Sequence, residues 1–305
     1  MLARWLRWLV VLETGCYLAL AAWLRWRGLL STSGCLLFIL GAPLLARALW
    51  LGGLMALSKQ TRRGSPPPAL PALTWARMFA REWLALIRVF GLVMPFEARW
   101  MGADRLNAAD GRTPVLLVHG YRCNRGVWLW MREALESRGH IVATLNLEPP
   151  LADIDIFARA LHTRIDEVLA ATGASQVALI GHSMGGLVAE AYLRQHGGER
   201  VTKLITLGSP FGGSALARFG QGRCAKQMQP GNPWLLALNA APAPLGVETT
   251  NLYSLHDALV APPDALQAGA HHIGFAGIGH LEMSWSVPVL ARVCDVLERD
   301  WITRR

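Results

Sequence analysis

The sequence predicts an α/β protein with a mostly parallel sheet covered by helices on both faces, preceded by an N-terminal hydrophobic helical membrane anchor. Three observations lead to this fold class. Two long apolar runs occupy the start of the chain, and from residue 113 short aliphatic runs alternate with segments of helical period. With 52% hydrophobic and 17% charged residues, the 305-residue chain is also too apolar to be disordered.

The net charge of +9 belongs entirely to the N-terminal third of the chain. Residues 1–100 contain 12 basic and three acidic residues, a balance of 12 − 3 = +9, whereas residues 101–305 contain 18 of each. Basic charge mixed with apolar sequence favours a membrane surface over a phosphate groove. We therefore expect a membrane partner and no nucleic acid partner.

Residues 1–58 are predicted to form a membrane anchor of two transmembrane helices joined by a tight basic turn. The run from Trp8 to Leu24 is broken only by Glu13, and the run from Gly28 to Ala46 carries no charge. About 20 apolar residues span a bilayer core, and eight of the 13 tryptophans fall within the first 100 residues, as interfacial belts predict. A cleaved signal peptide and two buried core helices are the alternatives.

Residues 59–100 are predicted to be a proline-rich linker followed by an amphipathic helix. Four prolines between Gly64 and Pro71 indicate a stiff connection. From Thr74 to Val93, tryptophan and phenylalanine recur at helical spacing among arginines, which is typical of a helix at a membrane interface. An ordinary helix packed on the following domain fits the same pattern, so both interpretations stay open.

Residues 101–305 are predicted to form one α/β domain. Short, continuously apolar strands separated by helices indicate a parallel sheet covered on both faces. The loops that follow such strands meet at one edge of the sheet, where the sites of α/β proteins lie. The predicted strands are Val115–Val118, Ile141–Leu145, Val177–Ile180, Leu204–Leu207, Asn251–Leu255 and Ile273–Ala276, and the predicted helices are Val127–Ser137, Ile154–Ala171 and Leu187–His196.

A G-x-S-x-G motif, Gly181-His182-Ser183-Met184-Gly185, lies between a predicted strand and a predicted helix. A serine on a sharp strand-to-helix turn is the arrangement called a nucleophile elbow. Gly181 and Gly185 are required there because a Cβ at either position would collide with neighbouring backbone. We therefore predict that Ser183 is a catalytic nucleophile, with a buried structural serine as the alternative.

A serine nucleophile needs a base that is oriented by an acid. The elbow fold requires the chain order serine, acid, histidine, with each residue on a loop after a strand. Asp257 and His280 satisfy both conditions, because each follows a predicted strand. The competing residues precede their strand, adjoin the proposed acid or lie beyond a proline pair; they are Glu248, His256, Asp264, His271 and His272.

An oxyanion hole requires two backbone N–H donors. Met184, the residue after the nucleophile, is predicted to supply one of them. Tyr121, in the loop after the first strand, is predicted to supply the other, with Gly120 permitting the close approach of the backbone. We expect His119 to brace this loop rather than to transfer protons.

The sequence predicts no metal site and no cofactor. The five cysteines do not have the spacing of a zinc site, and a Cys123–Cys224 disulfide stays open. A long insertion, residues 211–246, separates two predicted strands and could be an apolar lid over the serine. A surface segment with only a structural role is the alternative.

These motifs together resemble the bacterial triacylglycerol lipases and esterases of the α/β-hydrolase fold. The resemblance spans roughly residues 113–295 and rests on five segments: Val118-His119-Gly120-Tyr121, Leu145-Asn146-Leu147-Glu148-Pro149-Pro150, the elbow, Thr206-Leu207-Gly208-Ser209-Pro210 and Gly279-His280-Leu281. It implies a Ser183 nucleophile, an Asp257 acid and a His280 base. Where many lipases have Pro-His-x-Gly-Ser, this chain reads Pro210-Phe211-Gly212-Gly213-Ser214.

The predicted function is hydrolysis of carboxylic esters, with lipid-like acyl chains, through an acyl-enzyme at Ser183. An acyltransferase that uses the same acyl-enzyme and a catalytically silent membrane adaptor are the alternatives. The resemblance implies a location at the bacterial inner membrane. Basic residues flank both apolar runs, so the side of the membrane that the catalytic domain faces stays open.

Overall fold

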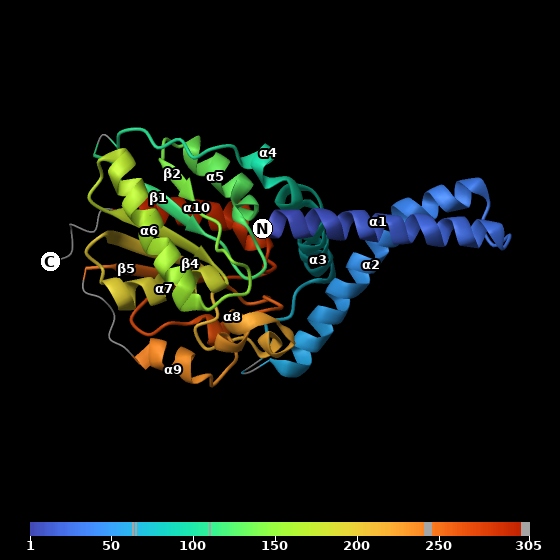
Figure 1. The fold of residues 1–305 in the computed structure, drawn as a ribbon. Helices are drawn as coiled ribbons and strands as arrows, with labels where there is room; N and C mark the ends of the chain where they lie inside the picture. Colours follow the sequence, from blue (N-terminus) through green and yellow to red (C-terminus); the bar gives the residue numbers. More distant parts are fainter. Residues whose placement is uncertain (63, 65, 110, 241–245, 300–305) are drawn as a thin grey trace.

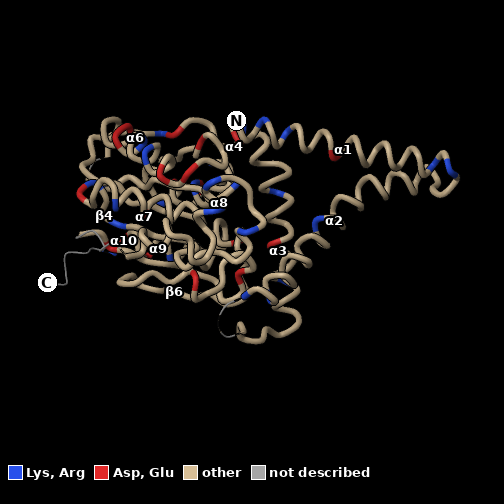
Figure 2. Tube along the Cα trace, turned by 60° about the horizontal axis from the view of Figure 1, so that its bottom comes forward, with Lys and Arg blue, Asp and Glu red and all other residues tan. Residues whose placement is uncertain are grey.

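The computed structural model describes the chain except residues 63, 65, 110, 241–245 and 300–305. Two long helices, α1 (Leu2–Trp26) and α2 (Thr32–Thr61), form a hairpin that projects from an α/β body (Figure 1). Both are long and apolar enough to cross a membrane, and only 6% of the most apolar window of each is buried. Basic residues lie at the tip of the hairpin, and few charges lie along its length (Figure 2).

The chain after the hairpin packs on the body. The helix α3 (Ala72–Leu86) continues into the π-helical segment η1 (Ile87–Val93), the turn η2 (Met94–Phe96) and the short helix α4 (Glu97–Met101). Met78, Ala85 and Val89 are all buried. One face of this segment is therefore packed on the domain, whereas Trp75, Leu84 and Leu92 are exposed on the rest of it.

The body contains a six-stranded, wholly parallel sheet in the order β2-β1-β3-β4-β5-β6. The strands are β1 (Val115–Val118), β2 (Val142–Thr144), β3 (Val177–His182), β4 (Val201–Leu207), β5 (Glu248–Ser254) and β6 (His271–Phe275). Glu248, His271 and His272 lie within strands, not before them as predicted, because the pairing of β5 with its neighbours extends into polar sequence.

Helices cover both faces of this sheet (Figure 1). They are α5 (Leu129–Glu136) and α10 (Val287–Glu298) on one face and α6 (Ile154–Thr172) and α7 (Met184–His196) on the other. The helices α8 (Gly222–Gln227) and α9 (Pro233–Ala240) belong to the segment between β4 and β5, and the 3-10 turns are η3 (Arg125–Trp128), η4 (Ala215–Phe219), η5 (Pro262–Ala265) and η6 (Glu282–Ser284). Alternate residues of β1 enter opposite cores: Leu116 and Val118 pack with α6 and α7, whereas Val115 and Leu117 pack with α5 and α10. A strand buried on both faces must be apolar throughout, which explains its sequence.

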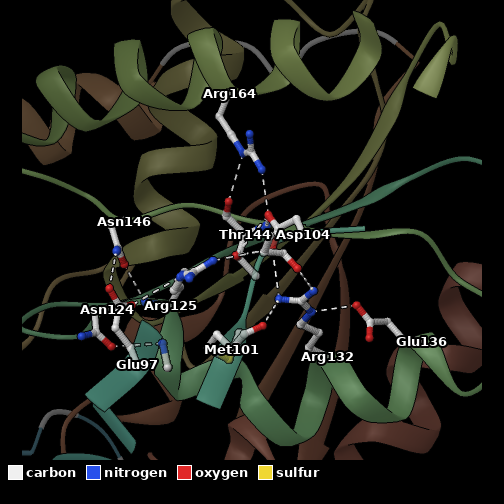
Figure 3. Close-up of polar contacts among 12 residues, drawn as sticks. Glu97, Met101, Asp104, Asn124, Arg125, Arg132, Glu136, Thr144, Asn146 and Arg164 are labelled. Carbon is white, nitrogen blue, oxygen red and sulfur yellow. Dashed lines mark hydrogen bonds and ion pairs between the residues drawn. The ribbon is translucent and has the colours of Figure 1, made fainter. Parts of the chain in front are cut away.

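Asp104 fixes the segment that connects the helical region to β1 (Figure 3). One carboxylate oxygen accepts a hydrogen bond from Arg132 at 3.1 Å, and the other accepts bonds from Arg164 and from the Thr144 backbone N–H, both at 2.7 Å. The carboxylate is buried and its charge is compensated by the two guanidinium groups. This network ties the connecting segment to β2, α5 and α6.

Candidate active site

Ser183 lies on the turn between β3 and α7. Its backbone has φ 54° and ψ −124°, a conformation that non-glycine residues rarely adopt and that is frequent at functional sites. The turn is crowded as well as strained. A Cβ at Gly181 would lie 2.6 Å from the Gly186 nitrogen, and a Cβ at Gly185 would lie 2.0 Å from the Val118 carbonyl oxygen. Only glycine fits at both positions.

Asp257 and His280 meet at the same edge of the sheet as Ser183, since they follow β5 and β6. The His280 Nδ1 lies 2.7 Å from the Asp257 Oδ2, and both side chains are buried. The other carboxylate oxygen accepts the backbone N–H groups of Leu259 and Val260 at 2.7 and 2.9 Å. The carboxylate is therefore held in one orientation, facing the imidazole.

The protonation of His280 depends on the charges around it. Burial by itself lowers the pKa of the imidazole, but the charge and hydrogen bond of Asp257 and the charge of Glu82 outweigh burial and raise the pKa of His280. His182 packs against this ring, with 4.8 Å between ring centroids, and its Nε2 donates to the His280 carbonyl oxygen at 3.0 Å. Burial and the charge of His280 lower the pKa of His182 to about 3, so His182 is neutral.

Ser183 and His280 line the same cavity. Within the described part of the chain, no hydrogen bond joins the Ser183 hydroxyl to the His280 ring. Hydrogen bonds between a nucleophile and its base are often long until substrate binds. The Nδ1 of His280 is engaged by Asp257, so its Nε2 is the ring atom left for a proton from the serine.

The loop after β1 lies against the nucleophile. A Cβ at Gly120 would lie 2.9 Å from the Ser183 Cβ, so only glycine permits this approach. The Tyr121 hydroxyl donates to the Gln221 carbonyl oxygen and accepts the Gln221 N–H, both at 2.8 Å, which fixes the loop. Met184 is the first residue of α7, so its N–H has no partner inside the helix. Of the two residues predicted as oxyanion donors, Tyr121 follows Gly120, which approaches Ser183, and Met184 follows Ser183 itself.

His119 has both ring nitrogens occupied within this loop. Its Nδ1–H donates to the Gly120 carbonyl oxygen, and its Nε2 accepts the Leu147 N–H, both at 3.0 Å. Burial lowers the pKa of His119 to about 4. A neutral, fully bonded imidazole braces the loop, in agreement with the role expected from the sequence.

Arg62, at the end of α2, holds the loop that carries Asp257, and the sequence did not reveal this contact. Its guanidinium donates to the carbonyl oxygens of Asp257 at 2.9 Å and Leu255 at 3.2 Å. The neighbouring His256 also contacts the N-terminal region, since its Nε2 lies 2.9 Å from the Pro68 carbonyl oxygen. The region between α2 and α3 is thus attached to the acid loop.

Glu82 of α3 holds the loop that carries His280, and the sequence analysis missed it too. The buried carboxylate accepts the N–H groups of Leu281 and Glu282 at 2.8 and 2.9 Å. Gly279 is required for this contact, because a Cβ there would lie 2.3 Å from the Glu82 Oε2. Burial raises the pKa of Glu82 to about 7, against the effect of these hydrogen bonds and of the charge on His280. Its charge therefore changes near neutral pH.

A cavity of about 810 Å³ opens over Ser183 and His280, and most of its lining side chains are apolar. Part of the lining comes from the segment 211–246, which folds into η4, α8 and α9; residues 241–245 of it lie outside the described residues. The opposite part of the lining comes from α2 and α3. The cavity thus lies between the catalytic domain and the N-terminal region.

Among the described residues, no group of three or more histidine, cysteine, aspartate or glutamate side chains could hold a metal ion. Cys123 and Cys224 are free and buried, so the disulfide left open by the sequence is not formed. Burial raises the pKa of the Cys123 thiol to about 12, which keeps it protonated.

A parallel sheet with a strained serine turn after β3, and with an acid and a histidine after later strands, defines the α/β-hydrolase fold. Residues 113–253 match the family described as alpha/beta hydrolase fold. The chain therefore has the predicted α/β-hydrolase fold, and its resemblance to the bacterial lipases and esterases is confirmed.

Two curated relatives and one solved structure illustrate the similarity. A triacylglycerol lipase of Burkholderia plantarii is 34% identical over 161 residues, which cover 50% of this chain and 43% of the relative. A 1-acylglycerol-3-phosphate O-acyltransferase of Arabidopsis thaliana is 30% identical over 121 residues, which cover 37% of this chain and 29% of the relative. The chain thus spans less than half the length of these relatives. A lipase structure from Bacillus licheniformis, 18% identical, shares the fold with a TM-score of 0.57 over 62% of this chain and 94% of that one.

Proposed function

We propose that the protein is a membrane-anchored serine hydrolase that cleaves carboxylic esters with lipid-like acyl chains. In this proposal residues 1–58 anchor the chain in the membrane, residues 59–100 connect the anchor to the catalytic domain, and residues 101–305 form the catalytic domain. The observation that supports it most is the buried 2.7 Å contact between His280 and Asp257 in a cavity shared with Ser183. The similarity to triacylglycerol lipases adds to it.

The proposed reaction has two stages. The Ser183 hydroxyl oxygen attacks the ester carbonyl carbon while the His280 Nε2 takes the hydroxyl proton, and Asp257 stabilises the resulting imidazolium. The N–H groups of Tyr121 and Met184 stabilise the negative charge on the carbonyl oxygen. His280 then protonates the leaving alcohol, which leaves an acyl group on Ser183. In the second stage water attacks this acyl group with the same assistance and releases the carboxylic acid.

The membrane location rests on the hairpin. Its two helices have mean hydropathy of 1.3 and 1.9 over their most apolar windows, and their apolar side chains are largely exposed. With both spans in the bilayer, the two ends of the hairpin lie on one side of the membrane and its basic tip on the other. Basic residues are more numerous at the domain end of the hairpin than at its tip, which favours the cytoplasmic side for the catalytic domain.

The test of the proposal is hydrolysis of nitrophenyl esters by detergent-solubilised protein beside its Ser183→Ala variant. We expect kcat to fall on the order of 10⁶-fold in the variant, as for other serine hydrolases, without a change in thermal unfolding. Turnover retained by Ser183→Ala would contradict the assignment. Absence of serine-dependent turnover on every ester would favour the silent adaptor.

Transfer of the acyl group to an alcohol is the second candidate, since one relative is an O-acyltransferase. Both activities form the same acyl-enzyme and differ only in what attacks it. Product analysis with a competing acylglycerol acceptor distinguishes them. A transfer product that exceeds the free acid in aqueous buffer would favour the acyltransferase.

A further inference from the structure

The cavity over Ser183 has two walls that come from distant parts of the sequence. One wall belongs to the catalytic domain and is made by η4, α8 and the loop after β5. The other wall belongs to the N-terminal region, and its large apolar side chains are Trp50, Leu51, Leu54, Leu57, Leu86 and Phe90. A helix that the sequence predicts only as an anchor therefore borders the candidate active site.

The wall formed by α2 is a single face of that helix. Its cavity-lining positions are 50, 51, 53, 54 and 57. Positions 50 and 53, 50 and 54, 51 and 54, and 54 and 57 are three or four residues apart, which keeps these positions on one side of the helix. Leu51 is only 2% exposed, whereas Leu49 is 66% exposed. The helix thus turns one apolar face to the cavity and another outward.

Hydrogen bonds at two points fix the position of this part of α2 relative to α3 and the Asp257 loop. The Trp83 Nε1 donates to the Leu44 carbonyl oxygen at 3.0 Å, which ties α3 to α2 above the wall. Arg62 binds the Asp257 loop below it. The distance between the α2 wall and Ser183 is therefore set by contacts at both ends of the wall.

The polarity and volume of the cavity indicate which kind of ligand it can bind. The reactive end is polar, with Ser183 and His280, and most of the remaining lining is apolar. A volume of about 810 Å³ lies within the range of roughly 300–1,000 Å³ that is typical of ligand sites. A long, apolar, unbranched group joined to an ester would place its carbonyl at Ser183 and its chain along α2.

We propose that residues 50–57 of α2 form the acyl-chain wall of the substrate site, and that the substrate is a long-chain acyl ester that enters from the bilayer along this helix. The outward face of the same helix is apolar enough to lie in lipid, so the path from membrane to serine follows one element. The inference rests on the proposed function for its ester, but its own claim concerns where the acyl chain lies.

The first test narrows the cavity beside the α2 wall. Leu54→Trp and, separately, Leu57→Trp add bulk to the cavity, and Leu49→Trp adds the same bulk to the outward face of α2. For each cavity variant we expect the ratio of kcat/KM for a palmitoyl ester to that for a butyryl ester to fall by at least about tenfold. The ratio should stay unchanged in Leu49→Trp. An unchanged ratio in both cavity variants, with serine-dependent turnover intact, overturns the inference and leaves the proposed function standing.

The second test does not require turnover. A diazirine-bearing fatty acid is crosslinked to Ser183→Ala protein in lipid nanodiscs, and the labelled peptides are mapped. We expect labelling within residues 50–57 that decreases when Leu54→Trp is added. Labelling confined to outward residues such as Leu45 and Leu49, and insensitive to Leu54→Trp, overturns the inference. Labelling of the wall, combined with no ester hydrolysis by the protein that retains Ser183, would support the acyl site and refute the proposed function.

Discussion

The strand β1 and the helix α2 are both continuous apolar segments, yet they meet different surroundings. Every side chain of β1 is buried, because alternate residues enter the two cores of the sheet. Half of the 30 residues of α2 are exposed, including Leu36, Leu37 and Leu40, and all but one of the others are partly exposed. Leu51 is the one residue of α2 that is fully buried among those described.

The difference shows that apolar sequence has two uses in this chain. In the catalytic domain, burial by the protein itself provides the hydrophobic stabilisation, and the packing tolerates no added atoms. In the hairpin, the apolar surface needs an environment from outside the described residues, which in our proposal is the bilayer. The wall formed by residues 50–57 belongs to both regions, since α2 contacts the catalytic domain there.

The largest expected effect on stability comes from adding one methyl group at a glycine in each of the two regions. Gly185→Ala places a Cβ 2.0 Å from the Val118 carbonyl oxygen and 2.9 Å from that of His119, whereas nothing lies within 4 Å of a Cβ at Gly41 in α2. We expect Gly185→Ala to lower the free energy of unfolding by about 3 kcal/mol or more. Gly41→Ala should change it by no more than about 1 kcal/mol, in the stabilising direction, because alanine favours helix.

Thermal unfolding of both variants in the same detergent measures the contrast. Similar losses of stability in Gly185→Ala and Gly41→Ala would show that the hairpin is packed as tightly as the core. The comparison between the two regions would then be wrong.

Asp104→Ala tests whether buried charge, and not only apolar packing, joins the helical region to the sheet. Removal of the carboxylate leaves the guanidinium groups of Arg132 and Arg164 without their buried partner, and such losses cost about 3–5 kcal/mol. Asp295→Ala is the control, because its ion pair with Arg292 is about half exposed and contributes at most about 1 kcal/mol. Denaturant unfolding monitored by tryptophan fluorescence gives both values. Equal effects would mean that Asp104 does not fix the connecting segment.

The fold was predictable because its signals are local. Strands buried on both faces of a parallel sheet must be largely apolar, and the aliphatic runs predicted β1 to β4 for this reason, whereas the edge strand β6 is largely exposed. The ends of β5 and β6 were misjudged because strand pairing, such as Thr250 with His271, continues into polar residues that no hydrophobic pattern reveals. The sequence also did not reveal that α2 has one face toward the cavity and another face outward, because leucine occurs on both faces.

The candidate site was predictable only where chain order carries information. Ser183, Asp257 and His280 each follow a strand in the order that the elbow fold requires. Arg62 and Glu82 act on loops about 195 and 200 residues away, and no local pattern records such contacts. One signal for Glu82 was available, because it is the only acidic residue between positions 14 and 96. A single carboxylate in a basic, apolar segment needs a partner.

The smallest and most specific effect that we expect is a shift in the pH dependence of kcat/KM in Glu82→Gln. The titratable groups that face His280 are Asp257, Glu82 and His182, and the charge of Glu82 helps to raise the pKa of His280. A general base must be neutral, so activity falls as the pH drops through the pKa of His280. Since the pKa of Glu82 is about 7, its carboxylate is only partly ionised in the range where His280 titrates. Glu82→Gln removes that partial charge and so lowers the pKa of His280, and the acidic limb of the kcat/KM profile should therefore move to lower pH.

Glu282→Gln is the matched control for this pH dependence. Its carboxylate is also buried beside the His280 loop, where it accepts the Gly279 N–H at 3.2 Å, but it does not contribute to the raised pKa of His280. We expect the acidic limb to stay in place in Glu282→Gln, even where the rate falls because the loop is less well held. A limb that moves equally in both variants, or in neither, would reduce Glu82 to a structural support. A limb that moves only in Glu82→Gln would show that the N-terminal region reaches the catalytic base through charge as well as through packing.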